Sequence, residues 1–386
     1  MSTPAQERAV RLAGGRADEA AAAVVGRFGC RLLGLPGTHL GAARSPRRAP
    51  LYLGRPWHYW WQAHYIDCLV DAGRRELVRG LHYDGGYGRS AGALAARVLG
   101  TVRLRNGLRF PNDYYDDMAW LALAAHRLEG LAAAAGKPRR RPQRAAAALL
   151  PQLESAHTPD LGGGLFWSTR RDFKNTPATG PAALCFARTG RTARARELLD
   201  WLDAHLYDAG RRLYLDGIRS TGGRQVLVAD LYTYNQGPVL GALLELGTPA
   251  DLRRAADLVH GVAAGLTRQH RDGPVLRVHG TGDGGLFTGI LARYLAMAAA
   301  AQDLPAEVRQ LAGTLVARTA RAFWEGRRLQ AHRDGEALVF PADPAVPARE
   351  SYPPGSTVEL STQLQAWMTL EAAAAVQPEL GNGPVP

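Results

Sequence analysis

The sequence predicts an all-α fold, a single (α/α)6 barrel in which outer and inner helices alternate. Apolar residues recur at helical spacing through most of the 386 residues. The helical segments are also of two kinds, which alternate in six pairs with a repeat of roughly fifty to sixty residues. An open array of helical repeats is the architectural alternative. Six complete pairs joined by capped loops favour the closed barrel.

The first kind of segment has charged residues on one face and Ala, Leu and Val on the other, which is typical of a helix that covers a core. The expected outer helices span residues 5–28, 88–104, 142–156, 191–207, 250–270 and 305–324.

The second kind of segment is apolar, or rich in Gly and Ala, on all sides. This pattern is typical of a helix enclosed by other helices. The expected inner helices span residues 57–72, 113–134, 173–188, 233–247, 284–300 and 357–375.

The chain length alone would suit two or three domains. The repetition indicates one instead, a barrel domain over residues 1–376. Residues 377–386 are rich in Pro and Gly, and we expect a disordered C-terminal tail there.

The formal charge of +12 and the pI near 10 would suit a nucleic-acid-binding protein. Almost all basic residues are Arg, however, with Lys only at Lys137 and Lys174, and this usage is typical of a GC-rich coding sequence. The densest basic run, residues 137–144, is broken by prolines and has no interleaved aromatic residues for base stacking. We therefore predict no nucleic-acid partner.

The three cysteines, Cys30, Cys68 and Cys185, are odd in number and far apart. Their spacing indicates neither a disulfide framework nor a zinc site, so we expect buried thiols. His64, His126 and His260 have no second histidine three or four residues away, and no phosphate-binding loop is present. We therefore expect neither a metal nor a cofactor.

Residues 1–29 contain no long apolar core preceded by positive charge, so they do not resemble a signal peptide. No stretch approaches the roughly 20 apolar residues of a membrane span. The sequence as written therefore predicts a cytoplasmic protein without a membrane span, or a secreted one if an export segment has been removed. We expect a monomer.

The loops that enter the inner helices contain most of the unusual residues. Because such loops gather at one end of a closed barrel, we expect their aromatic side chains to share a single rim. Aromatic rings beside Asp, Asn and Gln are typical of sugar sites, where rings pack against C–H groups and polar side chains bind hydroxyls. The loops span residues 55–62, 106–117, 160–175, 232–237, 280–287 and 352–359.

Two adjacent carboxylates, Asp116 and Asp117, stand where one of these loops becomes an apolar helix. Each disfavours ionisation of the other, so one pKa should rise relative to its partner. One acid and one base are what glycoside hydrolysis requires, with retention if the carboxyls are about 5 Å apart and inversion at roughly 6.5 to 9.5 Å. The alternative is that one Asp caps the helix and the other is solvated.

Several motifs that contain these residues resemble glycoside hydrolase family 76, in the same order along the chain. The resemblance covers about residues 57–370. The motifs are WWQAHYID (60–67), NDYYDDMAW (112–120), GGGLFW (162–167), RDFKN (171–175), TYNQG (233–237) and DGGLFTG (283–289).

The resemblance implies an (α/α)6 barrel that cleaves α-1,6-mannosidic bonds in α-mannan or manno-oligosaccharides, with retention and without a metal. It also implies that Asp116 is the nucleophile and Asp117 the general acid/base; the local charges support the pair but do not order its two roles. A non-catalytic carbohydrate-binding protein, or a glycosidase for another α-glycan, are the alternative functions.

Other motif residues are candidates for substrate binding: Trp61, Asn112, Trp167, Asp172, Lys174, Asn175, Tyr234, Asn235, Gln236, Asp283 and Phe287. Amides both donate to and accept from sugar hydroxyls, and the rings supply stacking faces. Asn175 and Asn235 could instead cap helices, and Asp172 with Lys174 could form an ordinary exposed pair. Asp67 and Trp120 lie further into their helices, so we expect structural roles for them.

Overall fold

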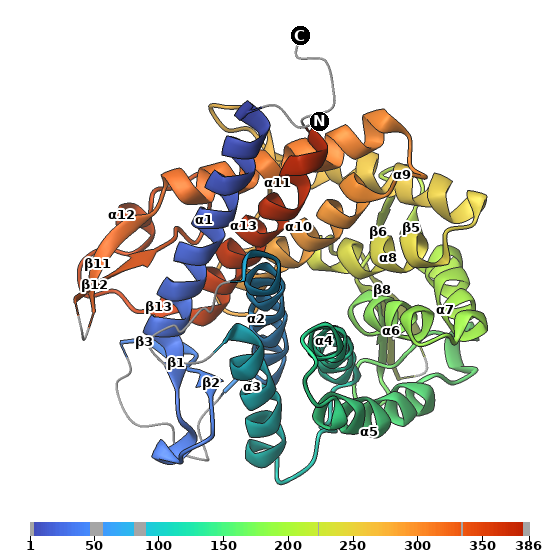
Figure 1. The fold of residues 1–386 in the computed structure, drawn as a ribbon. Coiled ribbons are helices and arrows are strands. Elements are labelled where there is room, and N and C mark those ends of the chain that lie inside the picture. Colours follow the sequence, from blue (N-terminus) through green and yellow to red (C-terminus); the bar gives the residue numbers. More distant parts are fainter. Residues whose placement is uncertain (1–3, 47–56, 81–89, 223, 333–334, 381–386) are drawn as a thin grey trace.

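A computed structural model describes residues 4–46, 57–80, 90–222, 224–332 and 335–380. Six helices form the inner ring of the described structure (Figure 1). Each inner helix packs against the next, and the last packs against the first, so the ring is closed. This confirms the predicted (α/α)6 barrel over the open array. The inner helices are α2 (Tyr59–Arg79), α4 (Tyr115–Ala134), α6 (Thr176–Arg188), α8 (Thr233–Leu246), α10 (Gly284–Ala300) and α13 (Leu360–Leu380).

Six further helices cover the outside of this ring, and each packs on at least one inner helix. The first of them, α1, lies beside the last inner helix, α13, so the two ends of the chain meet in the barrel wall (Figure 1). The outer helices are α1 (Pro4–Phe28), α3 (Ala91–Arg105), α5 (Arg140–Ala156), α7 (Thr192–His205), α9 (Pro249–Gly265) and α11 (Ala306–Glu325).

Local sequence signals explain where several helices begin. The Asn175 side chain accepts a hydrogen bond from the backbone N–H of Ala178 and caps α6, and Pro177 stands in the first turn, where no N–H partner is needed. The helix therefore begins at Thr176 and not at residue 173 as expected. The last helix, α13, ends at Leu380, and residues 381–386 of the expected tail lie outside the described residues.

Short antiparallel strands lie in the connections between the helices, and helical periodicity had not predicted them. One sheet has three strands, in the order β4-β7-β8, and the other described strands form two-stranded pairs. The strands are β1 (Gly29–Cys30), β2 (Leu40–Gly41), β3 (Arg44–Ser45), β4 (Phe173–Asn175), β5 (Tyr207–Asp208), β6 (Leu213–Tyr214), β7 (Gly217–Thr221), β8 (Arg224–Val228), β9 (Thr267–Arg268), β10 (Val275–Leu276), β11 (Arg328–His332), β12 (Gly335–Val339) and β13 (Val358–Glu359). Three single-turn helices complete the connections: Leu32–Gly34, Asp160–Gly162 and α12 (Ala348–Ser351).

Three inner helices bind nearby connecting segments through the same kind of contact. These segments lie at the rim, the end of the barrel where the inner helices begin, and we call them rim connections. The fourth residue of α2, α8 and α13 is a buried glutamine. Each amide accepts a hydrogen bond from the backbone N–H of one rim residue and donates one to the C=O of the same residue, over 2.8 to 3.0 Å. The three pairs are Gln62 with Gly41, Gln236 with Tyr214, and Gln363 with Phe340.

A buried ion-pair cluster joins three of the inner helices, α2, α4 and α10. Arg127 of α4 binds Asp67 and Asp71 of α2, and Arg293 of α10 binds the same two carboxylates over 3.3 and 3.1 Å. Burial alone would raise the pKa of Asp67, but the two guanidinium charges outweigh it and hold that pKa below its usual value. This confirms the structural role expected for Asp67.

The three cysteines are buried, as predicted. No helix in the described part of the chain is long and apolar enough to cross a bilayer.

We predict that Gln236→Leu destabilises the protein by roughly 2–4 kcal/mol, because Leu fills a similar volume but leaves the N–H and C=O of Tyr214 buried without partners. Urea unfolding followed by circular dichroism would measure the change. Gln143→Leu is the control, because Gln143 is exposed on α5 and surface changes of this kind stay within about 0.5 kcal/mol. Equal stabilities of the two variants would contradict the anchoring role.

Candidate active site

A cavity of about 700 Å³ lies at the end of the barrel where the inner helices begin. Its walls come from the first turns of α2, α4, α8 and α10 and from the connections around β4 and β7. Four carboxylates face it: Asp116, Asp117, Asp216 and Asp283. Aromatic side chains form much of the remaining lining: Tyr59, Trp60, Tyr114, Trp120, Trp167, Phe173, Tyr232, Tyr234 and Phe287.

Asp116 and Asp117 occupy the first turn of α4, and their hydrogen bonds differ. Asp116 accepts from two N–H groups: the backbone amide of Asp117 donates to Oδ1 over 2.9 Å, and the indole Nε1 of Trp167 donates to Oδ2 over 2.9 Å. Asp117 accepts one side-chain bond, from Nδ2 of Asn112 over 2.6 Å. N–H donors stabilise a carboxylate anion, so these contacts favour a negative charge on Asp116.

The pKa values of the pair follow the same asymmetry. Burial raises the pKa of Asp116 to about 7, although the bonds from the Asp117 amide and the Trp167 indole oppose the rise. Burial and the charge of Asp116 raise the pKa of Asp117 well above its usual range, and the bond from Asn112 does not offset them. Asp116 therefore ionises first, with a pKa of about 7, and Asp117 holds the last proton of the pair.

The aromatic walls face the pair from two sides. Tyr234 and Phe287 stack with their ring centroids 3.8 Å apart, and the Trp60 ring lies 6.4 and 6.2 Å from them. Trp167 and Tyr114 form a second aromatic pair in the lining, with ring centroids 5.0 Å apart. Aromatic faces that flank carboxylates in one concave site suit a sugar ring.

The match to known families and structures agrees with this geometry. Residues 37–340 match the model of glycosyl hydrolase family 76. The chain belongs to this family. No curated protein matches it.

Solved family 76 structures share the fold. The α-1,6-mannanase from Salegentibacter sp. HEL1_6 is 26% identical to this chain, with a TM-score of 0.77, and the match covers 94% of this chain and 99% of that chain. A variant of that enzyme, described as inactive, has two consecutive aspartates changed to asparagine and was solved with α-1,6-mannotriose; it is 25% identical, with the same coverage and TM-score. A family 76 mannosidase from Bacteroides thetaiotaomicron VPI-5482 is 16% identical, with a TM-score of 0.70 over 95% of this chain and 98% of that chain.

Most of the residues expected from the family 76 motifs lie at the cavity. Asp116, Asp117, Trp167, Asn175, Tyr234, Asp283 and Phe287 line it. Asn175 does so while it also caps α6, so its two expected roles coexist. Asn112 contacts the cavity through its bond to Asp117.

Asp283, which is exposed at the cavity mouth, connects two tryptophans. Its Oδ1 accepts from the indole Nε1 of Trp60 over 3.0 Å and from that of Trp61 over 2.8 Å. Trp61 itself is buried and stacks on His58 with a centroid distance of 3.8 Å. Trp61 therefore positions Asp283, contrary to the expectation that it contacts substrate, and its neighbour Trp60 supplies the ring at the cavity.

Lys174 and Gln236 also differ from expectation, because backbone groups of the connections satisfy their polar atoms. The buried Lys174 ammonium donates to the Thr158 carbonyl and hydroxyl, and to the carbonyls of Asp160 and Gly163. Burial lowers the pKa of Lys174 to about 8. Both residues fix loops and neither lines the cavity. Asp172 likewise lies outside the lining, and it faces Arg219 over 3.5 Å instead of pairing with Lys174.

Asn235 neither caps α8 nor lines the cavity, but donates through Nδ2 to Oδ1 of Asp216 over 3.2 Å. Sequence reasoning missed Asp216, which lines the cavity as a fourth carboxylate beside Asp116, Asp117 and Asp283. Burial raises the pKa of Asp216 to about 6, and the Asn235 bond opposes the rise. The Asp216-Gly217 dipeptide, where β7 begins, could have signalled it. Trp120 was expected to be structural, yet it also lines the cavity.

We predict that Asp117→Asn stabilises the protein at neutral pH by roughly 1–3 kcal/mol. Burial raises the pKa of both carboxyls in the folded state, so the folded protein binds their protons more tightly than the unfolded chain does. The free energy of unfolding should therefore fall as the pH rises from about 4 through 7, and Asp117→Asn should reduce this slope.

Urea unfolding between pH 4 and 8 would measure both slopes. Asp113→Asn is the matched control, because the exposed Asp113 stands in the same loop; it should keep the wild-type slope. A wild-type slope in Asp117→Asn as well would contradict the prediction.

Proposed function

We propose that this family 76 protein is a retaining glycoside hydrolase that cleaves α-1,6-mannosidic bonds in α-mannan or manno-oligosaccharides. The unequal environment of Asp116 and Asp117 carries this proposal. The relative that is inactive after two consecutive aspartates are replaced was solved with α-1,6-mannotriose. Asp116-Asp117 is the single place in this sequence where two aspartates are consecutive.

In the first step, the ionised Asp116 attacks the anomeric carbon and forms a glycosyl ester. Asp117 gives its proton to the glycosidic oxygen, so the bond to the leaving sugar breaks without a free alkoxide. The hydrogen bonds from Trp167 and the Asp117 amide hold Asp116 ionised and oriented. The raised pKa of Asp117 keeps its proton available at neutral pH.

In the second step, water attacks the same carbon and Asp117 removes its proton. The ester has neutralised Asp116 by then, so the repulsion that raised the pKa of Asp117 is absent. The pKa of Asp117 therefore falls when Asp117 must act as a base. Release of the ester restores the charge on Asp116 and completes the cycle with retained configuration.

The cavity also supplies contacts for the sugar rings on either side of the bond. The stacked Tyr234 and Phe287 offer one apolar face, and Trp167 offers another. Asn175, Asp216 and Asp283 line the cavity with groups that bind hydroxyls. Asp216, which Asn235 holds in place, gives this site an acceptor for a sugar hydroxyl.

We predict that Asp116→Asn and Asp117→Asn each lower kcat on α-1,6-mannotetraose by about a thousandfold or more, because each removes one half of the acid and nucleophile pair. Product chromatography would measure the rates. Asp113→Asn should retain full activity. Unchanged turnover in both variants would refute the proposal.

Azide with a dinitrophenyl α-mannoside would then assign the two roles. Loss of the acid/base leaves the glycosyl ester open to azide, so Asp117→Asn should give the α-mannosyl azide. Loss of the nucleophile allows direct attack, so Asp116→Asn should give the β-mannosyl azide. The reverse pairing, read by NMR, would exchange the roles.

We also predict that Trp167→Phe moves the acid limb of the kcat/KM profile to higher pH. The variant keeps a ring but removes the indole N–H that opposes the rise in the pKa of Asp116. Trp324→Phe, on outer helix α11 away from the cavity, is the control. A lower rate without a shift of the acid limb would show that Trp167 contributes only ring contacts and does not affect the pKa of Asp116.

A further inference from the structure

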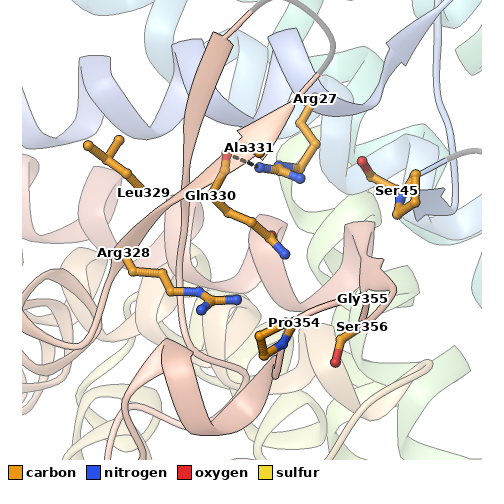
Figure 2. Close-up of a pocket in the computed structure, with 10 residues that line it drawn as sticks. Arg27, Ser45, Arg328, Leu329, Gln330, Ala331, Pro354, Gly355 and Ser356 are labelled. Atoms are coloured by element: carbon orange, nitrogen blue, oxygen red, sulfur yellow. Dashed lines mark hydrogen bonds between the residues drawn. The ribbon is translucent and has the colours of Figure 1, made fainter.

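A second cavity, of about 560 Å³, lies outside the inner ring (Figure 2). The end of α1, strand β11, the segment after β3 and the loop before β13 form it. No residue lines both this cavity and the candidate active site. Its polar side chains include Arg27, Ser45, Arg328, Gln330 and Ser356.

Two guanidinium groups face this cavity without a carboxylate partner. Arg27 is only 4% exposed, and its Nη2 makes two long bonds, of 3.4 and 3.5 Å, to the backbone carbonyls of Gln330 and Ala337. Arg328 donates to the backbone carbonyl of Tyr352. Within the described part of the chain, neither forms an ion pair with an Asp or Glu, and the Nε of each is buried without an acceptor.

Placing two cations together in a buried site costs free energy. Burial, and next the charge of Arg328, lower the pKa of Arg27. Arg127 and Arg293, which are also largely buried, bind carboxylates instead. An anion in the cavity would offset both the repulsion and the lost hydration.

The rest of the lining restricts the size and chemistry of such an anion. The Gln330 side chain extends between the two arginines, and its buried Oε1 has no partner (Figure 2). Leu329, Ala331 and Pro354 add apolar surface. The volume is several times that of a bare oxyanion and falls in the range of roughly 300–1,000 Å³ typical of small-molecule sites.

We propose that this cavity binds a small organic phosphate, with Arg27 and Arg328 on the phosphate oxygens and Gln330 beside them. Two guanidinium forks match a dianionic phosphate in charge and in geometry. The Gln330 acceptor and the apolar surface suit a hydroxyl-bearing body the size of a sugar. The site stands apart from the hydrolytic reaction and does not depend on it.

Calorimetry with mannose 6-phosphate and with mannose tests the proposal directly. We expect the phosphate to bind at least tenfold more tightly than mannose, and added NaCl to weaken its binding. Arg328→Gln should weaken it about tenfold, because a charge-assisted bond is lost. Arg328→Lys should weaken it less, about threefold, because it keeps the charge but not the planar fork.

Arg253→Gln is the matched control, since it removes one charge from the exposed face of α9 and lines neither cavity; it should bind like the wild type. Thermal unfolding without ligand would show whether Arg328→Gln is folded. If it is not, Arg328→Lys and the position of the phosphate in a soaked crystal decide the question.

The same titration in Asp116→Asn/Asp117→Asn separates this site from the active site. Unchanged binding there, with the loss confined to the Arg328 variants, supports the second cavity even if the protein proves not to hydrolyse mannan. Equal affinities for mannose and its phosphate, or wild-type affinity in folded Arg328→Gln, would overturn the proposal.

A phosphorylated mannotetraose distinguishes two sources of the phosphate. Affinity more than tenfold above that of mannose 6-phosphate, lost in Arg328→Gln, identifies a phosphate carried on the polysaccharide. Equal affinity, also lost in Arg328→Gln, identifies a free sugar phosphate.

Discussion

The position of the active site depends on how the inner helices bind their rim connections. These connections are too short to form a core of their own, so the buried glutamine amides of α2, α8 and α13 hold them by two bonds each. Gln236 binds Tyr214, two residues before Asp216, and so places that carboxylate in the cavity. In α6 and α10 a threonine hydroxyl makes one such bond: Thr179 accepts from the Leu165 N–H, and Thr288 donates to the Arg277 carbonyl. An amide that makes two hydrogen bonds to one residue fixes the orientation of the connecting segment as well as its distance from the helix.

The different hydrogen bonds of Asp116 and Asp117 come from different parts of the chain. Asn112 precedes α4, whereas Trp167 belongs to the next rim connection. The buried Lys174 ammonium gathers carbonyls of residues 158–163 just before that tryptophan. The charge on Asp116 is therefore set by the packing of a neighbouring loop, and a change far from the reacting atoms can alter which carboxyl holds the proton.

The sequence was sufficient for the architecture, because the contrast between all-apolar and one-sided helices reports burial directly. It also located the Asp116-Asp117 pair, because the electrostatic cost of two like charges can be recognised when the two residues are adjacent in sequence. It could not tell which polar motif residues face inward. Trp60 and Trp61 are adjacent in sequence and chemically identical. Only the orientation of α2 about its own axis decides which of the two lines the cavity. Lys174 and Gln236 bind backbone groups that are distant in sequence. Asp216 stands between the short strands β6 and β7, which helical periodicity does not predict.

The contact between α1 and α13 has a consequence for synthesis. During translation the first helix leaves the ribosome more than three hundred residues before the last one, and its partner surface does not yet exist. The apolar sides of α1, α2 and α10 must wait for α13 before the ring can close. Such long-range closure is slow and exposes apolar surface in the meantime. A ribosome that stalls before residue 360 would therefore release an open, aggregation-prone horseshoe that chaperones must hold.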